Sequence, residues 1–119
     1  MKLAVVILAL AMTGCATVAD IEHTPATMSV MSGKNPQEYA DCFLHKIADS
    51  RKPPQIEPRH EGLRIIVPQK FIQGDPAAIL DIEPRSSGSS IKVYERISNV
   101  PMRPKDVQRA ATACISGEA

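Results

Sequence analysis

The sequence predicts an α+β fold in two layers: one helix, a three-stranded antiparallel meander and a C-terminal helix. Apolar residues recur at helical spacing directly after a capping sequence at Asn35. Three stretches between residues 62 and 97 then alternate apolar and polar residues, as half-buried strands do. A second helical stripe follows Pro104. We therefore expect both helices to cover one face of the sheet.

The first helix is predicted to begin at Asn35-Pro36-Gln37-Glu38. The Asn35 side chain can cap the helix, Pro36 suits the first helical position, and Glu38 stands where a capping box places an acid. The helix should end near Ser50, ahead of Pro53. Its apolar face comprises Tyr39, Ala40, Phe43, Leu44 and Ile47, with Cys42 at the edge.

The predicted strands cover residues 62–69, 78–83 and 91–97. The proline-rich stretch 51–61 is expected to be an irregular connection. A shorter alternation over residues 26–31 allows an edge strand. The last helix is expected at residues 104–116 and ends at Gly117, with Val107, Ala110, Ala111 and Cys114 as its apolar stripe.

The hairpin between the second and third strands has a predicted register. Leu80 and Val93 must share the buried face, so the numbers of paired residues must have an odd sum. A two-residue turn at Gly88-Ser89 meets this condition. The predicted pairs are then Leu80–Ile97, Ile82–Glu95, Asp81–Arg96 and Glu83–Tyr94.

The start of the chain predicts export. Lys2 precedes an apolar run of 10 residues, Leu3 to Met12, which is too short to span a membrane. The run leads directly into Thr13-Gly14-Cys15. This arrangement resembles the lipobox of bacterial lipoproteins, although the family prefers Leu where this chain has Met12. The alternative is an ordinary signal peptide with a chance cysteine near its cleavage site.

The lipoprotein resemblance implies a processing path. Cys15 would carry a diacylglyceryl group, and cleavage would fall between Gly14 and Cys15. In Gram-negative bacteria the new amino group is usually acylated too, often with palmitate. Several acyl chains on one residue hold a protein firmly on a bilayer. Residue 16 is Ala, without the aspartate that tends to mark inner-membrane retention, so we expect the outer membrane and its periplasmic face.

This interpretation divides the chain into three parts: a signal peptide (1–14), a lipidated N-terminus and tether (15–34), and one small domain (35–119). With Cys15 lipidated, Cys42 and Cys114 remain in an oxidising compartment, where an even pair predicts a disulfide. The two helices should therefore be linked through Cys42–Cys114.

Composition excludes some functions. Lys2 is one of 14 basic residues, so the rest of the chain has 13 basic and 13 acidic residues and lacks the positive charge of nucleic-acid binders. No phosphate loop, serine elbow or zinc-protease motif is present. We assign no catalytic residue, metal ligand or cofactor. Cys42 and His45 have metal-ligand spacing, but the disulfide outweighs that interpretation. The four residues IEPR occur at 56–59 and 82–85, and we interpret this as chance.

Two function classes remain. The first is a non-enzymatic binding or assembly module of the cell envelope, which meets a protein partner through the exposed sheet face around Arg64, Tyr94 and Arg96 or through an edge strand. The alternative is a small periplasmic enzyme, or an inhibitor of one, acting on cell-wall material. Asp81 and Glu83, on one strand face, would then be the candidate acid pair.

Overall fold

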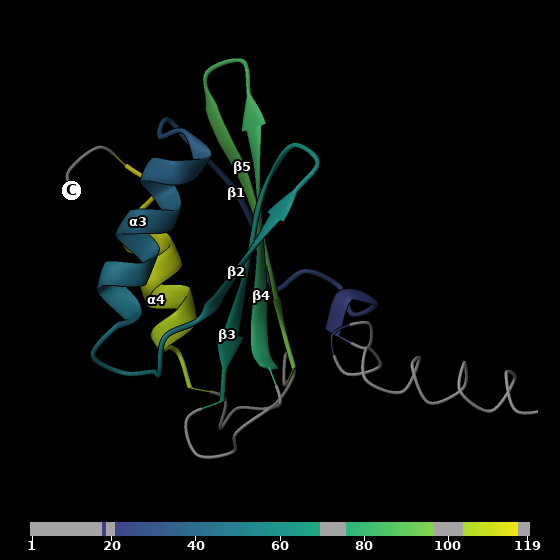
Figure 1. Ribbon diagram of the computed structural model, residues 1–119, viewed down its shortest axis with the longest axis vertical. Coiled ribbons are helices and arrows are strands. Elements are labelled where there is room, and N and C mark those ends of the chain that lie inside the picture. The colour runs from purple at the N-terminus through teal and green to yellow at the C-terminus, as the bar shows by residue number, and fades with distance from the viewer. Residues whose placement is uncertain (1–17, 19–20, 70–75, 97–103, 117–119) are drawn as a thin grey trace, which may run out of the picture.

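The computed structural model describes residues 18, 21–69, 76–96 and 104–116. Five strands form one antiparallel sheet, and two helices lie together on one side of it (Figure 1). The signal segment, Cys15 and Gly117 lie outside the described residues. In chain order the elements are β1 (Met28–Ser32), α3 (Pro36–Ile47), β2 (Gln55–Arg59), β3 (Gly62–Pro68), β4 (Pro76–Arg85), β5 (Gly88–Glu95) and α4 (Asp106–Ala113).

Helix α3 begins as its sequence predicts. Asn35 Oδ1 accepts a hydrogen bond from the Glu38 amide at 2.8 Å, and Glu38 Oε1 accepts one from the Asn35 amide at 3.0 Å. Pro36 occupies the first turn. The helix ends at Ile47, whose carbonyl accepts the Ser50 amide at 3.0 Å. The capping box is confirmed, and the helix ends three residues before Ser50, ahead of Pro53 as predicted.

The predicted three-stranded meander is wrong, because the sheet has five strands in the order β1-β5-β4-β3-β2. Residues 55–59, predicted to be irregular, form edge strand β2, in which Pro58 is tolerated because an edge strand has one side without ladder bonds. Residues 28–32 form the opposite edge strand, β1, which confirms the edge strand that the alternation over residues 26–31 allowed, although the same residues were also counted in the tether.

The β4–β5 register has the predicted parity but different pairs. Leu80 lies opposite Val93, an odd sum, and Ile82 lies opposite Ile91. The last pair is Arg85 with Gly88, so the two-residue turn is Ser86-Ser87 and not Gly88-Ser89. Asp81 therefore faces Lys92, and Glu83 faces Ser90.

The core lies between the sheet and the two helices. Tyr39, Phe43 and Ile47 of α3 and Val107 and Ala111 of α4 are at most 2% exposed. They pack against fully or almost fully buried strand residues, namely Ile65, Val67, Ala78, Leu80, Ile82, Ile91 and Val93.

Glu95 lies on this buried face, opposite Ala78, and is 3% exposed. Its Oε2 atom accepts hydrogen bonds from Thr27 Oγ1 at 2.7 Å and Gln108 Nε2 at 2.9 Å. The acid that interrupts the apolar alternation of β5 is therefore solvated by protein groups from the chain before β1 and from α4.

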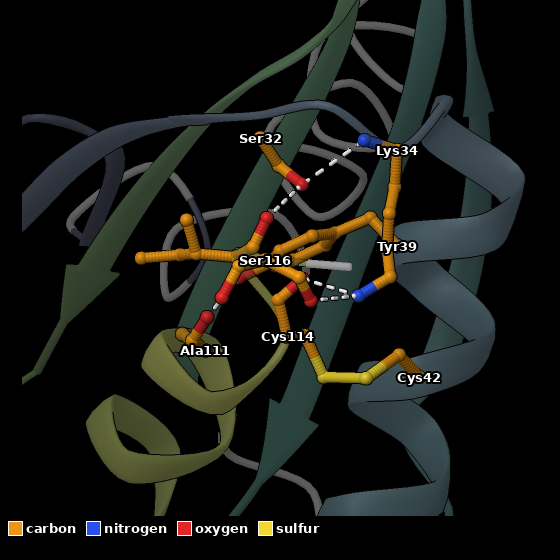
Figure 2. The surroundings of a disulfide bond; sticks show 8 residues. Ser32, Lys34, Tyr39, Cys42, Ala111, Cys114 and Ser116 are labelled. Atoms are coloured by element: carbon orange, nitrogen blue, oxygen red, sulfur yellow. Dashed lines mark hydrogen bonds between the residues drawn. A yellow bond between two sulfur atoms is a disulfide. The ribbon is translucent and has the colours of Figure 1, made fainter. Parts of the chain in front are cut away.

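A disulfide joins α3 to the end of α4, as predicted (Figure 2). The Cys42 and Cys114 sulfurs are 2.09 Å apart, and the Cα atoms 5.9 Å. Lys34 Nζ donates to the Cys114 carbonyl at 3.0 Å and to the Ser116 carbonyl at 2.7 Å. These bonds satisfy carbonyls that the end of a helix leaves without a partner.

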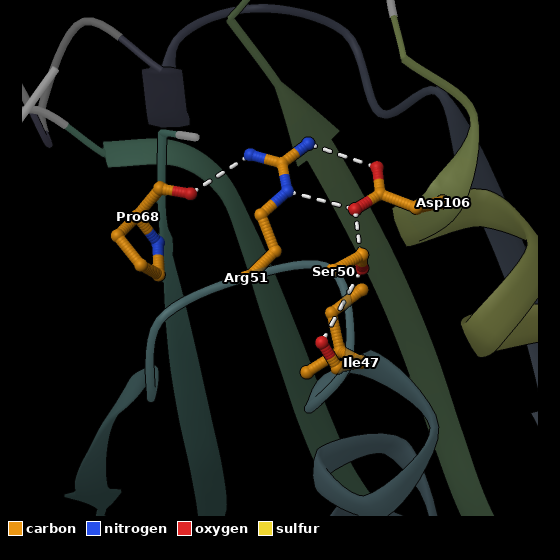
Figure 3. Close-up of polar contacts among 5 residues, drawn as sticks. All are labelled: Ile47, Ser50, Arg51, Pro68 and Asp106. Atoms are coloured by element: carbon orange, nitrogen blue, oxygen red, sulfur yellow. Dashed lines mark hydrogen bonds and ion pairs between the residues drawn. The ribbon is translucent and has the colours of Figure 1, made fainter. Parts of the chain in front are cut away.

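A second polar link joins the other ends of the helices (Figure 3). Arg51 binds Asp106 through two hydrogen bonds, Nε to Oδ2 at 2.8 Å and Nη2 to Oδ1 at 2.9 Å. Arg51 Nη1 also donates to the Pro68 carbonyl at 2.8 Å, and Ser50 Oγ donates to Asp106 at 2.8 Å. This network fixes the α3–β2 connection to α4 and β3.

The other sheet face is partly covered by the chain before β1 (Figure 1). Ile21 is 2% exposed, and Glu22 forms an ion pair with Arg64 of β3 at 2.8 Å. Ile79 of β4, which points away from the helices, is fully buried. Ile21 and Glu22, which the sequence analysis assigned to the tether, are therefore docked on the sheet. Among the described residues, no helix is long and apolar enough to cross a bilayer.

Candidate functional site

Arg64, a predicted partner-binding residue, is buried and bound to residues of its own chain. It is 5% exposed, and it binds Asp81 through Nε at 2.7 Å and Nη2 at 3.0 Å. Glu22 lies 2.8 Å from the same Nη2 atom. The hydrogen bonds from Arg64 to Asp81, opposed by burial, raise the pKa of the guanidinium above its usual range. Arg64 therefore organises the outer face from within and is not free to bind a partner.

Tyr94 and Arg96 lie on the same outer face, on and just beyond β5. Tyr94 is half-buried opposite Ile79, and Arg96 is exposed, with Nε donating to the Pro76 carbonyl at 3.0 Å. These two predicted residues are therefore accessible to a partner, whereas Arg64 is buried and has a structural role.

The two candidate acids do not form a pair of equivalent carboxylates. Both Asp81 oxygens accept from Arg64, whereas Glu83 is exposed opposite Ser90. Because both oxygens of Asp81 are held by Arg64, this carboxylate is not presented to a substrate. The geometry gives the enzymatic alternative no support at this position.

The IEPR recurrence, which the sequence analysis interpreted as chance, extends over two hairpins of similar sequence and structure. Residues 56–67 and 82–93 are identical at seven of twelve positions: Ile, Glu, Pro, Arg, Gly, Ile and Val in the same order and spacing. Each copy forms the same structure, a strand ending in IEPR, a two-residue turn and a returning strand. The closing pairs are Arg59–Gly62 and Arg85–Gly88.

Packing explains some of the identities. Gly62 and Gly88 have φ values of 136° and 110°, a region that side chains disfavour. A Cβ on Gly62 would lie 2.1 Å from the Ile82 carbonyl oxygen, and one on Gly88 2.0 Å from that of Ser32. Each turn must therefore end in glycine to meet its neighbour. The repeated Ile and Val of the returning strands are core residues.

Packing does not explain the repeated charges. Glu57, Arg59, Glu83 and Arg85 are exposed, and within the part of the chain that the structure describes none of their side chains forms a hydrogen bond or ion pair. No side-chain contact within the described residues requires the same charges at both tips. The same two charges nevertheless occur at both tips, which makes them candidates for a binding role. The sequence analysis missed them because it compared only the four residues IEPR and not the glycine, Ile and Val that follow.

The two hairpin tips lie at the same end of the sheet (Figure 1). A hollow between them is lined by Arg59, His60, Glu61, Leu63, Asp81, Ile82 and Glu83. Gly62, between Arg59 and Glu83 in the sheet, contributes no side chain to fill it. Arg59 and Glu83, on either side of Gly62, are two strand spacings apart, about 10 Å, and the repeat-equivalent residues Arg59 and Arg85 are offset by two further residues along the strand, which places them about 12 Å apart. We call Glu57, Arg59, Glu83 and Arg85 the paired-tip surface.

The two sheet edges differ in how they are protected. β2 carries Pro58 and charged residues, which discourage pairing with another strand. β1 has neither proline nor charge, and Met31 is 61% exposed beside a hollow lined by Ser29, Val30, Met31, Ser90 and Ile115. Of the two edges, β1 is the one open to an added strand.

Among the described residues, no three His, Cys, Asp or Glu side chains gather at metal-binding distances. Cys42, considered from sequence as a metal ligand with His45, is in the disulfide. No protein-family model, curated protein sequence or solved structure matches this chain significantly.

Proposed function

We propose that the protein is a lipid-anchored, periplasm-facing binding or assembly module of the cell envelope, without enzymatic activity of its own. Anchorage rests on the lipobox resemblance at Cys15. Binding rests on one observation: exposed charges that no fold contact requires are repeated in two adjacent hairpins.

The paired-tip surface favours a partner with two equivalent recognition elements. Each tip presents one carboxylate and one guanidinium on the outer face, at Glu57 and Arg59 in one copy and at Glu83 and Arg85 in the other. A partner that offers complementary charges twice, about 12 Å apart, engages both tips at once. Two weak contacts on one rigid sheet then act as a single, much tighter one.

The test is crosslinking of the acylated protein in intact cells, followed by purification from solubilised membranes. The variant R59E/R85E reverses one charge in each tip. We expect recovery of a stoichiometric envelope partner to fall about tenfold, because like charges then face each other at both contacts.

The matched control is K46E/R109E, which makes the same change in net charge at exposed positions of α3 and α4. Equal recovery with both double variants would contradict the proposal. Tyr94→Ala examines the surface predicted from sequence, and we expect it to retain the partner. Turnover of a cell-wall fragment that is lost on Glu83→Gln would favour the enzymatic alternative instead.

A further inference from the structure

The docked segment before β1 determines which sheet face is tied to the anchor. Ile21 is buried on the outer face, and Glu22 is held by Arg64. Thr24 closes the turn, its amide and Oγ1 both donating to the Ile21 carbonyl at 3.1 and 2.7 Å. If Cys15 carries lipid, as the proposed function requires, only six Cα steps separate the lipid from Ile21, at most about 22 Å.

The charge on that outer face is concentrated beside β1. Lys92, Tyr94 and Arg96 alternate with buried residues, so all three point away from the helices. Lys92 is exposed and, among the described residues, no carboxylate lies within ion-pair distance, because its cross-strand neighbour Asp81 is bound by Arg64.

The acidic residues of this face offset the β5 charge only in part. Asp81 and Glu22 share the buried Arg64, which leaves one negative charge in that group, and Glu57 and Glu83 lie toward the hairpin tips with an arginine each, so these groups together with Lys92 and Arg96 keep one net positive charge. Tyr94, an amphipathic aromatic residue of the kind enriched at membrane interfaces, stands between the two cations.

We infer that the outer stripe Lys92–Tyr94–Arg96 rests on the anionic phosphates of the bilayer that holds the lipid anchor. The stripe and the docked segment before β1 lie on the same face, so one orientation satisfies both the short tether and the charge. Helices α3 and α4 then face away from the membrane, and the hairpin tips project parallel to it, where a partner reaches them.

The experiment uses the full acylated protein reconstituted in vesicles of phosphatidylethanolamine with about a third phosphatidylglycerol, or of phosphatidylcholine alone. A membrane-impermeant amine reagent labels exposed lysines, and mass spectrometry gives the labelling rate at Lys92 relative to Lys46, which is exposed on α3. We expect this ratio to be about fivefold lower in the anionic vesicles, because each basic residue is attracted to an anionic surface.

Arg96→Gln should return the ratio at least halfway toward its value in phosphatidylcholine. Arg109→Gln, at an exposed position on α4, should leave it unchanged. Equal ratios in both lipids for a protein that is acylated and membrane-bound would overturn the orientation while leaving the proposed function intact. Absence of lipid on Cys15, read from the intact mass of the same sample, would overturn both.

Discussion

Glu22 Oε2 lies 2.8 Å from Arg64 Nη2, so a residue that precedes the first strand is fixed to the middle of the sheet. The same guanidinium binds both oxygens of Asp81. One buried cation thus connects the N-terminal segment to β3 and β4, and its removal is the most direct test of how that segment is held.

Arg64→Ala is expected to lower the free energy of unfolding by about 3 kcal/mol, because it leaves Asp81 without its buried counter-charge. Urea denaturation measures the effect. Arg59→Ala, at an exposed position, should change stability by less than about 0.5 kcal/mol. Glu22→Gln should cost less than about 1 kcal/mol, since the Glu22 side chain is 39% exposed. Similar losses for Arg64→Ala and Arg59→Ala would contradict this view of the network.

The Cys42–Cys114 disulfide closes a loop with a sequence separation of 72 residues. Its loss in C42A/C114A should destabilise the protein by about 4 kcal/mol, on the model in which the crosslink restricts the unfolded chain. Thermal unfolding of the wild type with and without reductant should show a matching difference. An unfolding midpoint insensitive to reductant would show that the two thiols are not paired.

Burial raises the pKa of Tyr39 above its ordinary value of 10.0, and its hydroxyl donates to the Ala111 carbonyl at 2.5 Å. The unfolded chain releases this proton at a lower pH than the folded protein does, so stability should be constant toward neutral pH and fall above about pH 10.

Tyr39→Phe should cost about 1 kcal/mol at neutral pH, through the lost hydrogen bond, and make the alkaline decline shallower. Chemical denaturation at a series of pH values measures both effects. Tyr94→Phe, on the outer face, is the control. An alkaline slope that Tyr39→Phe leaves unaltered would assign the decline to other groups.

The Arg51–Asp106 contact is buried, with side chains 4% and 14% exposed. Asp106→Ala should therefore lower the free energy of unfolding by about 3 kcal/mol, because Arg51 loses two charge-assisted hydrogen bonds. The comparison is Asp49→Ala, at an exposed position where little change is expected. Equal effects of the two variants in urea denaturation would refute a structural role for the contact.

Local patterns predicted the helices well, because capping and apolar spacing are encoded within a few residues. The Asn35–Glu38 capping box and the buried stripe through Val107 and Ala111 are examples. The edge strands were harder to predict. The alternation over residues 26–31 allowed β1 but could not show that it pairs with β5, more than 50 residues later, and every residue of β2 is exposed, so no buried face imposes an alternation on it.

The hairpin turn shows a second limit. Glycine at residue 88 suggested a turn corner, but Gly88 instead closes the hairpin and passes within contact of the Ser32 backbone. The same holds for Gly62 against Ile82. Comparison of the two IEPR segments through their glycines would have revealed the repeated hairpin from the sequence.

The candidate site was only partly within reach of sequence reasoning. Tyr94 and Arg96 are accessible, as predicted, whereas Arg64 is buried. The sequence could not show this burial, because a cationic side chain on a strand gives no local sign of a partner as distant in the chain as Glu22.

The most direct test of the account is the intact mass of the protein extracted from membranes. We predict a chain that begins at Cys15 and carries diacylglyceryl and amide-linked acyl groups, and that gains two hydrogen atoms on reduction of Cys42–Cys114. A chain that begins at Met1, carries no lipid and leaves the membrane fraction on washing would contradict it.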